Sequence, residues 1–151
     1  MDSQNYILLS LPSKVEYALL ALLEMASQPD LKKPLTVNEI TAKQPIPERY
    51  LEQIFASLRR GGLLKSQRGS KGGYVLAREP QDITLLEIVS IIEGNRQIKE
   101  NMDVSTVEMK LIQESWQQAN QAAQSILGQY TLLDLCKQRE SYIQQSLMYY
   151  I

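Results

Sequence analysis

Apolar residues recur at helical spacing near the start of the chain. Between Lys14 and Ser27 an apolar stripe follows the three- and four-residue steps of a helix, formed by Val15, Leu19, Leu22, Leu23 and Ala26. A Ser or Thr followed three residues later by Glu is a capping box, which marks the first turn of a helix. We place three helix starts at such pairs: Ser13 with Glu16, Thr36 with Glu39, and Thr84 with Glu87.

The next stretch predicts two helices joined by a short turn. The first runs from Thr36 to about Lys43 and is broken by the sequence QPIP, because a residue before proline disfavours the helical conformation. The second helix begins near Pro47, which suits a first turn. It carries an apolar stripe and ends at a pair of glycines: Leu51, Ile54, Phe55 and Leu58, then Gly61 and Gly62. Two such helices, the second ending in arginines, indicate a helix-turn-helix.

A hairpin and a fourth helix complete the first 94 residues. Two short strands, Leu64–Gln67 and Tyr74–Ala77, flank a glycine-rich turn. A helix-turn-helix followed by such a hairpin is a winged helix. The fourth helix is expected from Thr84 to Gly94, and its apolar positions should close the core: Leu85, Ile88, Val89 and Ile92.

Beyond residue 94 the pattern changes. Residues 95–105 are polar and predict a loop, and 106–127 predict a long helix within a dimerisation region, 106–138. That helix carries an apolar stripe with a tryptophan nearby: Val107, Leu111, Trp116, Ala119, Ala122, Ala123 and Ile126. We expect a symmetric partner to cover the stripe, the alternative being the chain's own domain. A short helix starting at Thr131–Leu135 and a tail, 139–151, follow. The predicted fold is mainly α, with a winged helix-turn-helix domain at 1–94 and a long C-terminal dimerisation helix.

Composition excludes much common enzyme chemistry. The chain has one cysteine, Cys136, and no histidine, so it lacks a Cys/His zinc site, a Ser-His-Asp triad and an internal disulfide. We therefore expect no catalytic residues, no metal and no cofactor. The single cysteine, the absence of a membrane-spanning apolar run and the absence of a basic leader together predict a cytoplasmic protein.

The charges are unevenly distributed although the net charge is −1. From Gln53 to Arg78 there are six basic residues and no acidic one, whereas Glu79 to Ser115 holds eight acidic and three basic residues. A basic patch on a nearly neutral chain is typical of a protein that binds a polyanion. The alternative is an ordinary solvated face, which usually mixes both signs.

Two motifs are more specific than the general pattern. The sequences YLEQIFASLRRGGL and RGSKGGY, within residues 11 to 94, resemble the Rrf family of bacterial transcriptional regulators. The resemblance implies that the third helix reads the DNA major groove and that a wing arginine enters the minor groove. The implied base readers are Arg49, Glu52 and Gln53, with Arg68 on the wing. Contacts to DNA phosphates are implied for Arg59, Arg60, Lys65 and Lys71. A contact near the DNA backbone is implied for Lys14. Alternatively, Glu52 pairs with a nearby arginine. Tyr50 is expected in the core or in helix packing.

One departure from the family concerns iron. Many members hold an iron–sulfur cluster through three cysteines between the fourth helix and the long helix, but residues 95–115 contain no Cys and no His. Such clusters need thiolate ligands. We therefore expect a member without a cluster. Cys136 is expected to pack in the interior, the alternative being a redox-sensing thiol.

The chain ends in SLMYYI, an apolar tail with a free carboxylate. It resembles the cluster-free branch of the family, which represses cysteine metabolism and has the enzyme cysteine synthase as its partner. That resemblance implies a homodimeric repressor of sulfur or cysteine metabolism, which binds double-stranded DNA. It also implies docking of Tyr149, Tyr150 and Ile151 into cysteine synthase. Two alternatives stay open: the tail packs on its own dimer, or the protein is mainly an adaptor or inhibitor of that enzyme.

Overall fold

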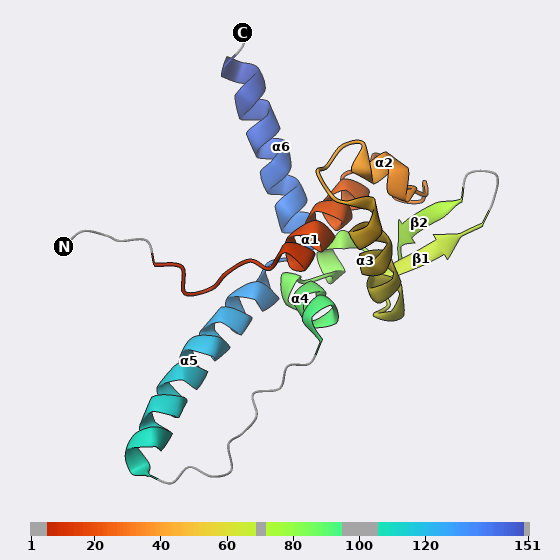
Figure 1. Cartoon of the computed structure of the whole chain (residues 1–151). Coiled ribbons are helices and arrows are strands. Elements are labelled where there is room, and N and C mark those ends of the chain that lie inside the picture. The colour runs from red at the N-terminus through yellow and green to blue at the C-terminus, as the bar shows by residue number, and fades with distance from the viewer. Residues whose placement is uncertain (1–5, 69–71, 95–105, 150–151) are drawn as a thin grey trace.

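The computed structural model describes residues 6–68, 72–94 and 106–149. The helices of the N-terminal part are α1 (Ser13–Ala26), α2 (Val37–Thr41), α3 (Glu48–Arg60) and α4 (Leu85–Glu93). Strands β1 (Leu64–Gln67) and β2 (Gly73–Leu76) form the hairpin, and a short 3-10 helix, η1 (Pro80–Asp82), precedes α4. Helices α5 (Val107–Gln129) and α6 (Leu132–Tyr149) extend from this body in different directions (Figure 1). This is the predicted winged helix with a long C-terminal helix.

The core lies where α1, α3 and α4 meet the hairpin. The predicted stripe of α3 is buried in full, and Phe55 packs its ring edge-on against Tyr74 of β2 with the ring centroids 4.7 Å apart. In α1 the buried apolar residues are Val15, Ala18, Ala21, Leu22 and Met25. The predicted Leu19, Leu23 and Ala26 are only half-buried. In α4 only Ile88 of the predicted set is fully buried.

The hairpin is antiparallel, with Leu64 opposite Leu76 and Gln67 opposite Gly73. Leu35, just before α2, adds a short bridge on the far side of β2, because its N–H and C=O both bond to Tyr74 at 3.0 and 2.8 Å. A Cβ at Gly73 would lie 2.6 Å from the Leu35 carbonyl oxygen. The second glycine of the GGY motif is therefore required by the close approach of two backbones.

A backbone joint fixes α5 and α6 to the winged helix. Leu85 donates its N–H to the Tyr130 carbonyl at 2.9 Å, and Leu132 donates to the Ile83 carbonyl at 2.8 Å. The side chain of Leu132 is fully buried in the core. The turn between the two long helices is thus paired like a strand with the segment before α4. We call the residues Ile83–Leu85 and Tyr130–Leu132 the joint.

Polar contacts also connect α6 to α1. The Glu24 side chain is buried and accepts a hydrogen bond from Gln44 Nε2 at 2.7 Å, and Arg139 of α6 lies 3.9 Å from the same carboxylate oxygen. Ser27 Oγ donates to Cys136 Sγ at 3.8 Å. The base of α6 is therefore held by α1 on one side and by the joint on the other.

The structure corrects two predictions. Ser13 does not cap α1: it is the first helical residue, Pro12 is the N-cap, and the Glu16 N–H bonds to the Pro12 carbonyl instead. The last helix is not short, because α6 continues to Tyr149 through most of the expected tail, 139–151. By contrast, Thr36 and Thr84 accept hydrogen bonds from the N–H groups of Glu39 and Glu87, as predicted. The expected loop, 95–105, lies outside the described residues.

Candidate nucleic-acid interface

Helix α3 presents two faces of different chemistry. Its apolar stripe points into the core, and Arg49, Glu52 and Gln53 lie exposed on its outer side. Within the part of the chain that the structure describes, these three side chains make no ion pair, so the alternative that Glu52 pairs with a nearby arginine finds no support. A free carboxylate, an amide and a guanidinium on one exposed helix face can all hydrogen-bond to base edges in a major groove.

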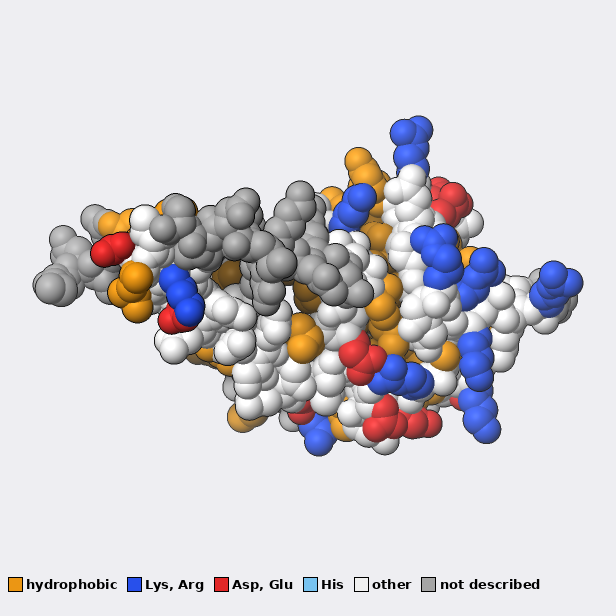
Figure 2. Space-filling model, turned by 90° about the horizontal axis from the view of Figure 1, so that it is seen from below, with side chains coloured by type: hydrophobic (Ala, Val, Ile, Leu, Met, Phe, Trp, Pro, Cys, Tyr) orange, Lys and Arg blue, Asp and Glu red, His pale blue; other side chains and the backbone are white. Residues whose placement is uncertain are grey.

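Basic residues continue from α3 into the hairpin. Arg59 and Arg60 are exposed in the last turn of α3, where a helix favours positive charge. Lys65 and Arg68 are exposed on and just after β1, and Lys71 lies outside the described residues. Figure 2 shows basic side chains gathered over the side of the molecule that carries α3 and the hairpin. We call the described set the basic face: Lys14, Arg49, Arg59, Arg60, Lys65 and Arg68.

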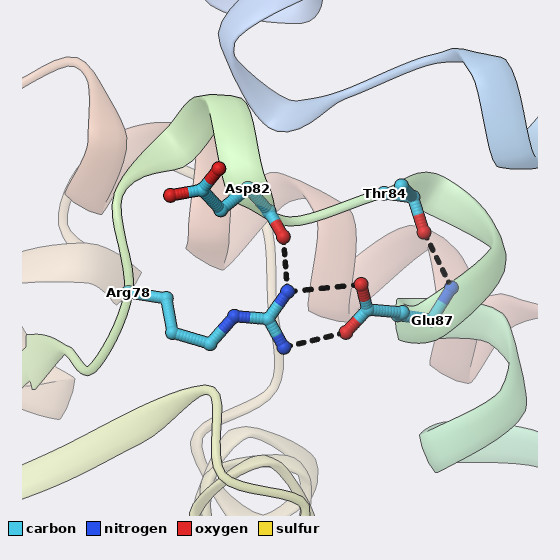
Figure 3. A network of polar contacts seen from close by, with 4 residues as sticks. All are labelled: Arg78, Asp82, Thr84 and Glu87. Carbon is cyan, nitrogen blue, oxygen red and sulfur yellow. Dashed lines mark hydrogen bonds and ion pairs between the residues drawn. The ribbon is translucent and has the colours of Figure 1, made fainter.

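Arg78, the last basic residue of the run, has a structural role instead. Its guanidinium bonds to both oxygens of Glu87 at 2.6 and 2.9 Å and donates to the Asp82 carbonyl, which ties the end of the hairpin to α4 (Figure 3). The hydrogen bonds from Arg78 hold the pKa of Glu87 below its usual range, and Glu87 in turn raises the pKa of Arg78. Arg78 is therefore engaged within the fold and does not belong to the basic face.

The structure places Lys14 next to α3. Lys14, in the first turn of α1, and Gln53 of α3 line the same surface hollow, together with Tyr50 and Ser57. Tyr50 is not in the core, because it is 43% exposed, but its ring centroid lies 6.2 Å from that of Tyr17 in α1, which agrees with the predicted helix packing. Sequence reasoning missed Tyr50 and Ser57 as surface groups. Tyr50 directly precedes Leu51, and Ser57 directly precedes Leu58, two buried positions of the α3 stripe. This spacing is the signal that could have placed both residues at the edge of the stripe.

Helix α5 is a second exposed surface. No residue of this helix is buried, and the predicted stripe is exposed except for Ala123, which is half-buried. The exposed large side chains include Val107, Leu111 and Trp116, the last at 75%, and also Met109 and Ile112, which sequence reasoning missed. The part of the chain that the structure describes therefore leaves the stripe of α5 uncovered.

The end of α6 is exposed in the same way. Leu147, Met148 and Tyr149 are 61%, 76% and 91% exposed, and Tyr150 and Ile151 lie outside the described residues. The described part of the chain therefore leaves Leu147, Met148 and Tyr149 uncovered. Cys136 lies near the base of α6, half-buried, and burial raises the pKa of its thiol. A raised pKa reduces the thiolate form that reacts with oxidants, which favours a packing role.

The described residues contain no group of three or more Cys, Asp or Glu side chains placed to hold a metal ion. Among their helices, none combines the length and the apolar character that a membrane span requires.

Comparison with known proteins identifies the family. The Rrf2 family, described as iron-dependent transcriptional regulators, matches residues 11–138. An HTH-type regulator of Synechocystis is 36% identical over 84% of this chain and 87% of its own length. The regulator CymR of Bacillus subtilis is 32% identical over 95% of this chain and all of its own.

Solved structures agree with the sequence relatives. The structure of CymR, titled as the global cysteine regulator of B. subtilis, matches with a TM-score of 0.74 over 86% of this chain and 98% of that one. IscR of T. potens also gives 0.74, at 32% identity, and covers 90% and 92% of the two chains. These relatives are transcriptional regulators and not enzymes. The chain belongs to the Rrf2 family of helix-turn-helix transcriptional regulators.

Proposed function

We propose that this protein is a homodimeric repressor that binds specific DNA sites in genes of sulfur or cysteine metabolism. The observation that carries the proposal is the basic face beside α3, whose base-reading candidates are exposed and free of ion pairs among the described residues. Similarity to CymR along nearly the whole chain supports the metabolic assignment.

The roles of the residues follow from groove chemistry. Glu52 accepts from cytosine N4, Gln53 bonds to adenine, and Arg49 bonds to guanine or a phosphate. Arg68 enters a narrow, electronegative minor groove. Phosphate contacts from Arg59, Arg60, Lys65 and Lys71 position the protein without reading sequence. Two copies joined through α5 would bind half-sites about one helical turn apart, roughly 34–36 Å, or a multiple of it.

We also propose that this member works without an iron–sulfur cluster, although its family is described as iron-dependent. A cluster of the family's kind requires several thiolates. The chain has one cysteine and no histidine, and that thiol is half-buried against Ser27. The residues present do not fit such a cluster, so no step of the proposed mechanism uses one.

Two substitutions on the basic face test the DNA-binding proposal. We expect Gln53→Ala to cost about 1–3 kcal/mol on the best site and to relax preference at one base pair per half-site. Arg68→Ala should weaken binding most where the minor groove is narrow. The site is first selected from a random duplex library, and affinities are then measured by mobility shift at several salt concentrations.

Gln138→Ala and Lys137→Ala, exposed positions on α6, are matched controls and should bind as the wild type does. If Gln53→Ala and Arg68→Ala both keep wild-type affinity and site preference, the assigned groove contacts are wrong.

A second candidate function rests on the exposed end of α6. Helix α6 extends away from the body (Figure 1), and Leu147, Met148 and Tyr149 near its end are exposed, so another protein can reach this end of the helix. We propose that Tyr149, Tyr150 and Ile151 dock into the active site of cysteine synthase, where backbone N–H groups hold the terminal carboxylate.

A peptide of residues Gln145 to Ile151 should then inhibit cysteine synthase competitively. The same peptide with an amidated C-terminus, or without Ile151, should not, because the carboxylate is what the pocket holds. Equal inhibition by the free and amidated peptides, or no inhibition at all, would reject tail docking and leave the DNA-binding proposal intact.

A further inference from the structure

The basic face contains a hollow whose lining includes two candidate DNA contacts, Lys14 and Gln53. It measures about 100 Å³ and lies between the first turn of α1, the middle of α3 and the end of α4. Its lining residues are Lys14, Tyr50, Gln53, Ile54, Ser57 and Ile92. A hollow of this volume admits several water molecules, and therefore a small polyatomic group.

The lining is built for an anion. Lys14, Tyr50, Gln53 and Ser57 can all donate hydrogen bonds, and none of the described residues that line the hollow is acidic. Ile54 and Ile92 supply the apolar part of its wall. A tetrahedral oxyanion satisfies several donors at once, and charge-assisted hydrogen bonds of this kind are the stronger ones.

Local contacts orient two of the hydroxyl groups. The ring of Tyr50 lies beside that of Tyr17, which restricts where its OH can reach. Ser57 Oγ accepts a hydrogen bond from Arg60 at 3.4 Å, so its own hydrogen is free to be donated to a ligand. Lys14 lies in the first turn of α1, whose N-cap, Pro12, makes no side-chain hydrogen bond to the helix.

We propose that this hollow seats one backbone phosphate of the DNA duplex, held by Lys14, Tyr50 and Ser57. The inference rests on the proposed DNA binding, because Gln53 lines the hollow and is also a candidate base reader. A phosphate held here would fix how α3 sits in the groove. Tyr50 and Ser57 are therefore positioning residues, which carry no sequence information themselves.

The test combines conservative variants with chemically modified DNA. Tyr50→Phe keeps the ring and removes the OH, Ser57→Ala removes the other hydroxyl, and Lys14→Ala removes the charge. A selected duplex is made with single neutral methylphosphonate substitutions along each strand, and the full-length protein is titrated against each duplex. Lys137→Ala and Tyr142→Phe on α6 are the matched controls, and thermal unfolding checks that every variant is folded.

We expect Tyr50→Phe and Ser57→Ala each to weaken binding about three- to tenfold, equally for the selected site and a random duplex. Lys14→Ala should also reduce the slope of log K against log salt by about 1. One methylphosphonate position should weaken the wild type but have little further effect on the three variants, because both changes remove the same interaction.

Three results would overturn the inference. The first is wild-type affinity and an unchanged methylphosphonate profile in Tyr50→Phe and Ser57→Ala, while the wild type binds its site; this leaves the proposed function standing. The second is binding of inorganic phosphate in the hollow with no shared DNA position, which assigns it to a free anion. The third is a wild type that binds no duplex at all, which removes the proposed function as well.

Discussion

Replacing Leu111 and Ile126 together by glutamate should convert the protein into a monomer and weaken binding to its DNA site about 10²–10⁴-fold. The two side chains are 58% and 55% exposed on α5, a helix with no buried residue in the chain itself. In a symmetric interface each substituted position occurs twice, so four carboxylates would enter an apolar contact. In a dimer, binding of one winged helix to its half-site raises the effective concentration of the second winged helix at the other half-site. A monomer lacks this gain, so its affinity for the full site is lower.

The matched control changes the charge equally on the other side of α5. Gln117 and Gln124 lie about half a turn away from the centre of the apolar stripe, so Gln117→Glu with Gln124→Glu should remain dimeric. Light scattering coupled to gel filtration gives the oligomeric state, and mobility shift gives the affinity. A Leu111→Glu, Ile126→Glu protein that stays dimeric with full affinity would show that α5 is not the interface.

Leu132→Ala should lower the free energy of unfolding by about 2–5 kcal/mol, the usual cost of emptying a leucine site in a core. Leu132 is fully buried although it begins a helix that otherwise extends away from the body, and its N–H pairs with Ile83. The total free energy of unfolding of a small domain is only about 5–15 kcal/mol, so this single change removes a large fraction of it.

Urea unfolding at fixed protein concentration measures the effect, because a dimer's stability depends on concentration. Leu147→Ala on the same helix is 61% exposed and should shift the free energy of unfolding by no more than about 0.5 kcal/mol. Equal small losses for both variants would mean that the joint contributes little to folding.

The winged helix could be predicted because its signals are local. The α3 stripe needs only helical periodicity, and the caps at Thr36 and Thr84 are determined within four residues. The failure at Ser13 is also local: Pro12 takes the capping position, and its carbonyl already accepts the N–H that Ser13 would need. A one-residue shift of this kind cannot be read from residue types alone.

Two features were not predicted from the sequence, the joint and the full length of α6. The first depends on long-range backbone pairing, and the second depends on the absence of residues that end a helix. The joint connects residues almost fifty positions apart, which no sequence period reveals. The length of α6 could have been inferred, because residues 130–151 contain no Gly or Pro to end a helix. Its start was also marked: Thr131 and Asp134 cap it reciprocally, each accepting the other's N–H at 3.2 and 2.9 Å.

The joint has a mechanical consequence. Backbone pairing and a buried leucine fix the turn between the two long helices to the segment before α4, and Glu24 and Ser27 hold α6 from the opposite side. A change in the angle between α5 and the α5 of a second copy, or a force on the far end of α6, would then move the whole winged helix as one body. We expect a signal received near the end of α6 to change the distance between the two winged helices of a dimer, with little rearrangement inside either one.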